Sequence, residues 1–190
     1  IEGQASVLEN LKIRGSGELL ALADQVRSGD PGNVEAQAAR LYWSRTLGRG
    51  VGRQPAAGQL IGANACLDYG YAVLRGHLMR AVLAAGLAPA LGVFHRGRGN
   101  AFALADDLIE PFRPAIDEVA LPLPATASPS DREVKQLLVA AASQRFDADG
   151  HGIPAVAEAL AQSFGRYIEG DIDRLQVVSW QGPSRVGVGD

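Results

Sequence analysis

Residues 64–86 read NACLDYGYAVLRGHLMRAVLAAG, and this stretch decides the expected fold. Apolar side chains recur through it at helical spacing, and Gly86 stands where a glycine often follows the last turn of a helix. Charged or titratable side chains interrupt the apolar run at Arg75, His77 and Arg80, so the stretch is unsuited to spanning a membrane. We therefore expect one long buried helix at the centre of a globular domain that has no membrane partner.

Helical patterns also dominate on both sides of this stretch. They predict helices over residues 17–27, 31–48, 102–120, from 130 onward and 154–170. Asp30 and Pro31 are expected to open the second of these, and the capping-box sequence of 130–133 the fourth. No repeat and no convincing sheet pattern is present, which predicts an all-α fold. The helical domain is expected over residues 1–170, and a partly extended or disordered tail, with LQVV (175–178) as a possible short strand, over 171–190.

The composition fits one globular domain. The chain has 190 residues, 47% hydrophobic and 21% charged, and a net charge of −3. This balance does not indicate a nucleic-acid partner for the whole surface, although a local basic face remains compatible with it. The single cysteine, Cys66, excludes an intrachain disulfide and is typical of a core residue in a reducing compartment, so we expect a cytoplasmic protein. No signal peptide is visible, and because Ile1 is not a methionine, we expect a processed chain or a piece of a longer one.

The segment FHRGRGNAFALADDLIEPFRP, residues 94–114, raises the question of function. Asp106 and Asp107 both lie about one helical turn from Glu110, so like charges are crowded unless a cation compensates them. His95 comes just before. On a helical wheel the polar residues of 102–120 lie opposite the apolar ones, and these polar residues include Asp106, Glu110, Arg113 and Asp117. From the residues alone, a solvated polar face and a metal site both remain open.

Glu35 has an equally simple explanation. It lies near the N-terminus of the helix predicted over 31–48, where a carboxylate interacts favourably with the helix dipole. Spacing alone does not connect it to His95 or to Glu110.

Two stretches carry a resemblance to a known family. They are GDPGNVEAQAARLYW (29–43) and the run from NACLDYG (64–70) to NAFALADDLIEPFRP (100–114), followed by Asp117. The chain resembles the CRISPR-associated integrase family, whose members insert new spacers into the array, and is most similar to the branch that works with an RNA-guided effector nuclease. The similarity covers about residues 1–170 and rests on several separate motifs.

The resemblance implies a site that spacing did not. Glu35, His95 and Glu110 match the three metal ligands of the family, and Asp107 matches an acid that supports them. Asp68 stands where relatives often carry asparagine. Family members begin with a β-rich domain that contributes to dimerisation and to contacts with a small partner subunit, and we expect that domain to be absent from this chain. The expected fold is therefore the C-terminal catalytic domain.

The implied activity is insertion of spacer DNA by transesterification, in which a DNA 3′-hydroxyl attacks a phosphodiester. A cation held by two carboxylates would be Mg²⁺, and an added imidazole favours Mn²⁺. The implied partners are double-stranded DNA (spacer precursor and CRISPR repeat), a second copy in the complete protein, and the small partner subunit. Candidate phosphate contacts, each also readable as ordinary surface charge, are Arg40, Arg45, Arg49, Arg53, Arg96 and Arg98.

Two other functions remain open: a catalytically idle DNA-binding or scaffolding fragment of the same family, and a related mobile-element transposase. A calcium loop over 147–158 is disfavoured. Its acids fall at suitable positions, but His151 and Pro154 occupy positions five and eight, and no second loop exists. We interpret this segment as a turn between helices, and His77 as a structural histidine.

Overall fold

The computed structural model describes residues 1–48, 52–55, 58–94 and 99–183. Within these ranges the regular structure is helical, and the remaining ladder pairing is one isolated bridge between Arg145 and Gly152. The all-α prediction is therefore confirmed. The elements are α1 (Glu2–Asn10), α2 (Ser16–Ala23), α3 (Val34–Thr46), α4 (Gly62–Ala84), α5 (Ala103–Leu108), the 3₁₀ turn η1 (Glu110–Phe112), α6 (Arg113–Ala120), α7 (Arg132–Ala141) and α8 (Ile153–Glu169).

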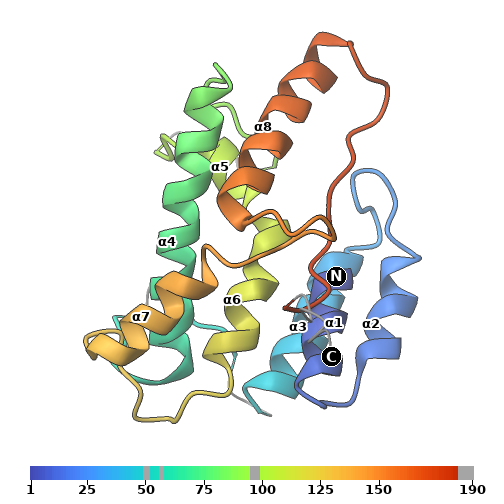
Figure 1. Ribbon diagram of the computed structural model, residues 1–190. Coiled ribbons are helices and arrows are strands. Elements are labelled where there is room, and N and C mark those ends of the chain that lie inside the picture. The colour runs from blue at the N-terminus through green and yellow to red at the C-terminus, as the bar shows by residue number, and fades with distance from the viewer. Residues whose placement is uncertain (49–51, 56–57, 95–98, 184–190) are drawn as a thin grey trace, which may run out of the picture.

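The predicted central helix is α4, which packs against α5, α6, α7 and α8 (Figure 1). Its inner face is fully buried at Leu67, Leu74 and Leu78, and Cys66 is buried with them, as predicted. Gly70 lets α6 approach closely, because a Cβ there would collide with the side chain of Ile116. No helix among the described residues has both the length and the apolar character needed to cross a bilayer.

A second group of helices covers the far side of α6. Helix α1 packs on α6, and α2 and α3 pack on α1 and on each other. Figure 1 shows this group beside α6 and apart from the α4–α8 pair. The segments that carry Glu35 and Glu110, α3 and the turn before α6, therefore come from different groups of helices.

The prediction of a single helix over residues 102–120 is wrong. The segment is divided into α5, η1 and α6, because Pro111 and Pro114 have no backbone N–H to donate the hydrogen bonds of a continuous α-helix. The amide of Phe112 instead bonds the carbonyl of Ile109 at 2.9 Å, which tightens the chain into a 3₁₀ turn at Glu110. Glu110 is therefore the first residue of this turn.

Helix starts also differ from the prediction. Helix α3 begins at Val34 rather than at Pro31, yet Asp30 still caps it: its carboxylate accepts bonds from the amides of Val34 (2.8 Å) and Glu35 (3.0 Å). Helix α7 begins at Arg132 after Asp131, but its N-terminus has no side-chain cap bond, so the capping box does not form.

The end of the described chain is anchored by Trp180. Residues 175–178 do not form a strand, and the Trp180 side chain is fully buried, packs on Phe146 at 5.5 Å and donates a hydrogen bond to Glu118 at 2.8 Å. An aromatic anchor in this tail was not anticipated from the sequence.

Candidate metal centre

Glu35 lies in the first turn of α3, with its side chain exposed. The Asp30 cap bonds the amide of Glu35 itself, so the backbone that carries the carboxylate is held in place. The side chain is free to project beyond the helix end. This geometry suits a ligand that must reach toward a second element.

Glu110 is the first residue of η1 and is exposed. Arg113, one turn later, bonds one of its carboxylate oxygens at 3.1 Å. The Arg113 guanidinium also lies over the ring of Tyr71, 4.9 Å from the ring centroid. Glu110 is therefore held by the Arg113 guanidinium, which in turn stacks on Tyr71 of α4.

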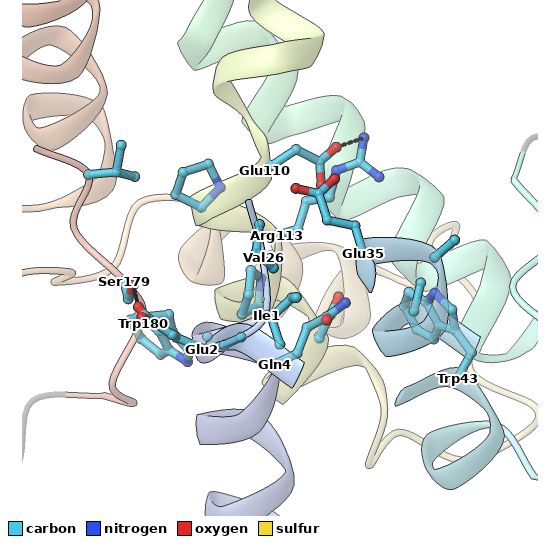
Figure 2. Close-up of a pocket in the computed structure, with 18 of the residues that line it drawn as sticks. Ile1, Glu2, Gln4, Val26, Glu35, Trp43, Glu110, Arg113, Ser179 and Trp180 are labelled. Carbon is cyan, nitrogen blue, oxygen red and sulfur yellow. Dashed lines mark hydrogen bonds and ion pairs between the residues drawn. The ribbon is translucent and has the colours of Figure 1, made fainter. Parts of the chain in front are cut away.

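The two glutamates face the same space. Both line a cavity of about 690 Å³ between α1, α3 and the η1–α6 segment. Figure 2 shows their carboxylates close to one another beside the Arg113 guanidinium. The structure thus brings together two residues that are 75 positions apart in sequence.

His95, the third predicted ligand, lies outside the described residues, as do Arg49, Arg96 and Arg98. The chain that leads to His95 is described, and Asp107 holds it. One carboxylate oxygen of Asp107 accepts hydrogen bonds from the amides of Val93 and Phe94, the second at 3.1 Å. The predicted supporting acid therefore contacts the backbone immediately before the predicted histidine.

Asp106 is not part of the cavity. Its carboxylate is bonded by Arg75 through two nitrogens, at 2.5 and 3.0 Å, and by Asn100 at 2.7 Å. These bonds tie α5 to α4. Asp106 is thus a structural ion-pair partner, and the charge crowding expected from the sequence is relieved by Arg75 on one side and Arg113 on the other.

Asp117 does not lie on a solvated polar face, which was one of the two alternatives left open for this segment. Its side chain is buried, at 1% exposure, and accepts hydrogen bonds from the hydroxyls of Tyr42 on α3, at 2.8 Å, and Tyr71 on α4. Burial raises the pKa of Asp117 to about 6, against the opposing effect of the two tyrosine bonds and of Arg113 and Arg53. Burial, and then Asp117, raise the pKa of both tyrosines well above its usual value. No sequence pattern pointed to this network, because its three members lie on three elements.

The described arginines differ in how exposed they are and in whether another side chain already binds them. Arg40 is exposed on α3, whereas Arg45 is bonded to Glu18 at 3.2 Å. Arg53 is engaged inside the protein: its side chain is 9% exposed, bonds Asn64 and Asp68, and lies 5.3 Å from the Tyr71 ring centroid. The placement of Arg53 opposes the predicted phosphate contact, and it gives Asp68 a structural partner.

Residues 147–152 form the predicted turn between helices, and α8 begins at Ile153. The amide and ring of His151 both bond the carboxylate of Asp147 at 2.8 Å, which lowers the pKa of Asp147 and raises that of His151. Ligand atoms of Asp147, Asp149 and His151 lie within 4.8 Å of one another, but these side chains are mostly exposed and this internal bond explains the grouping. The cluster is separate from the glutamate cavity.

Comparison with known proteins shows which proteins the chain resembles. A family model described as CRISPR associated protein Cas1 matches residues 32–131, which include Glu35, His95 and Glu110. The chain is 50% identical over 99 residues to the CRISPR-associated endonuclease Cas1 of Neisseria meningitidis serogroup C (strain 8013), covering 52% of this chain and 31% of that protein. A Cas1 endonuclease of Pyrobaculum aerophilum is 36% identical over 113 residues, covering 55% and 36%.

A solved structure shares the fold over nearly the whole chain. A casposase bound to integration product superposes with a TM-score of 0.70 at 17% identity, over 96% of this chain and 59% of the casposase chain. The matched regions span about a third of the length of the two Cas1 relatives. The family match covers more than half of the residues and includes Glu35 and Glu110, so the chain belongs to the Cas1 family of CRISPR-associated proteins.

Proposed function

We propose that this chain is the catalytic domain of a divalent-metal DNA integrase and endonuclease, with Glu35, His95 and Glu110 as the ligands of one Mg²⁺ or Mn²⁺ ion. The observation that carries the proposal is the convergence of Glu35 and Glu110 on one cavity from separate elements. Exposed carboxylate oxygens are the donors that these ions prefer, and an imidazole would add affinity for Mn²⁺.

The bound ion would activate a DNA 3′-hydroxyl and neutralise charge on the attacked phosphodiester. The chain supplies the positions of the ligands. Asp30 holds the backbone at Glu35, Arg113 holds Glu110, and Asp107 holds the backbone that enters His95. The reaction is a transesterification without a covalent protein–DNA intermediate, so the residues have only to orient and stabilise the reacting groups.

The complete protein is proposed to act on double-stranded DNA, as spacer precursor and CRISPR repeat, with a second copy and a small partner subunit. Arg40 and Arg45 are both exposed on α3, but Arg45 is already paired with Glu18, and Arg113 beside the cavity is paired with Glu110. Binding that neutralises few phosphates is weak and falls steeply with salt. We therefore expect the 190 residues alone to bind duplex DNA weakly and to lack two-ended integration.

A nicking assay on branched DNA tests the proposal. The chain is expected to nick slowly, with stimulation by Mn²⁺, and Glu35→Gln and Glu110→Gln are expected to remove this activity. Glu158→Gln, an exposed acid on α8 away from the cavity, is the matched control and should nick like the wild type. Nicking by Glu110→Gln at the wild-type rate would refute the proposed site, whereas a wild-type chain that does not nick would favour an idle DNA-binding fragment.

A further inference from the structure

We propose that Asp117 is a positioning residue that sets the separation of Glu35 and Glu110 by bonding Tyr42 and Tyr71 at once. This inference rests on the proposed metal site and adds residues that are neither ligands nor neighbours of the ligands in sequence. It assigns a role to a buried carboxylate that packing alone does not explain.

The first link runs from Asp117 to Glu35. Tyr42 is fully buried and donates its hydroxyl hydrogen to Asp117 at 2.8 Å. Glu35 and Tyr42 are seven residues apart, about two turns, and therefore lie on one face of α3. Because α3 is rigid, the position of Tyr42 determines the position of Glu35. A bond that fixes the Tyr42 hydroxyl therefore fixes the direction in which the first turn of α3 presents Glu35.

The second link runs from Asp117 to Glu110. The Tyr71 hydroxyl donates to the other oxygen of Asp117, and the Tyr71 ring supports the Arg113 guanidinium at 4.9 Å. Arg113 in turn bonds Glu110 at 3.1 Å. Tyr71, Arg113 and Asp117 also line the cavity that Glu35 and Glu110 share. One carboxylate is thus joined, through one tyrosine each, to both predicted ligands.

The packing around α3 shows why such a link matters. Within the described residues, α3 packs chiefly on α2 and α1, whereas α4 and α6 pack on each other. The Tyr42–Asp117 bond crosses between these two groups of helices. Without it, α3 would follow α1 and α2, and the first turn that carries Glu35 would be free to shift relative to η1.

A buried carboxylate is also an unfavourable choice for packing alone. Replacing a buried polar network by apolar side chains of similar shape is often neutral or stabilising. A purely structural role therefore predicts that such a replacement keeps function if it keeps the fold. A positioning role predicts the opposite, because apolar contacts have no preferred direction.

The test is Mn²⁺ binding to the 190-residue chain, followed by electron paramagnetic resonance of free Mn²⁺ during titration with MnCl₂, with thermal melts on the same samples. The triple variant Y42F/Y71F/D117L removes all three polar groups and leaves none unpaired. We expect it to melt near the wild-type temperature and to bind Mn²⁺ about tenfold more weakly. The single variant Y42F should weaken binding in the same direction, which keeps the test usable if the triple variant does not fold.

Three controls define the outcomes. Tyr167→Phe removes an exposed hydroxyl on α8 and should bind Mn²⁺ normally. Leu160→Ala opens the core on α8, which packs on α4 and α5, and should melt earlier while binding Mn²⁺ normally. Glu110→Gln should lose binding.

Wild-type Mn²⁺ affinity in both Y42F and the triple variant, with loss in Glu110→Gln, would overturn the positioning role and leave the metal site standing. Equal weakening in Leu160→Ala would also overturn it, because any loss of stability would then have the same effect. A wild-type chain that binds no Mn²⁺, or an unaffected Glu110→Gln, would overturn the metal site itself and this inference with it.

Discussion

The hydroxyl of Tyr42 donates a hydrogen bond to Asp117 at 2.8 Å, and this contact joins the helix that carries Glu35 to the helix that follows Glu110. It lies beneath a cavity in which these two glutamates, 75 residues apart, face each other. The account therefore depends on how firmly three short elements are held together. Each of the following predictions tests one part of that arrangement.

Asp117 should make stability depend on pH. Its pKa is raised by burial from 3.8 to about 6, so between these values the folded chain holds a proton that the unfolded chain has lost. The contribution of Asp117 to stability is then fully present below pH 4 and is lost as the pH rises through 6, by about 3 kcal/mol in total. Asp117→Asn lacks this titration. Urea melts from pH 4 to pH 7 should show wild-type stability falling relative to Asp117→Asn, and a constant difference would contradict the buried carboxylate.

Two glycines of α4 should respond oppositely to alanine. A Cβ at Gly70 would collide with the fully buried Ile116, so Gly70→Ala should cost about 1–3 kcal/mol by forcing α4 and α6 apart. Gly76 lies on the same helix with open space around it, and Gly76→Ala should stabilise by about 0.5–1 kcal/mol. Chemical denaturation measures both. Similar effects at the two positions would show that the α4–α6 approach is not as close as described.

Trp180 should anchor the C-terminal segment to the domain. Trp180→Ala removes a fully buried ring and its bond to Glu118, and should lower the free energy of unfolding by about 3–5 kcal/mol. Val177→Ala, at an exposed position three residues earlier, should change it by less than about 0.5 kcal/mol. Thermal or urea melts distinguish this anchor from a tail that makes no contribution.

Asp107 should affect metal binding more than stability. Asp107→Ala removes the acceptor for the amides of Val93 and Phe94, both exposed, so the melting temperature should change little. Binding of Mn²⁺ should weaken, because the segment entering His95 loses its anchor. Asp149→Ala, an exposed acid in the 147–151 turn, should leave Mn²⁺ affinity unchanged. The reverse pattern would move the metal site to that turn.

Local patterns predicted the helices well where one element explained them. The apolar run of 64–86 gave α4 nearly to its ends, because helical periodicity and Gly86 are both local signals. The same reasoning failed at 102–120, where Pro111 and Pro114 outweighed an amphipathic pattern that continues through them. It also placed Asp117 in solvent, since a wheel cannot show that tyrosines of two other helices cover that position.

The candidate site could be predicted only through resemblance. Glu35 alone is explained by the helix dipole and Glu110 alone by a polar helix face, and nothing local joins them. Their meeting depends on how α3 docks beside η1, which is a property of the whole helical arrangement. The structural role of Arg53 could not be predicted for the same reason, because its partners Asn64 and Asp68 are brought to it only by the folding of α4.

The central claim is that Glu35 and Glu110 bind one ion, and a crystal of the chain soaked in MnCl₂ tests it most directly. Anomalous scattering locates Mn²⁺ without reference to activity. We predict one strong anomalous peak in the cavity that Glu35 and Glu110 line. A carboxylate oxygen of each glutamate should lie about 2.0–2.3 Å from it. A Mn²⁺ ion found only at Asp147, Asp149 and His151, or bound by one of the two glutamates without the other, would contradict the account.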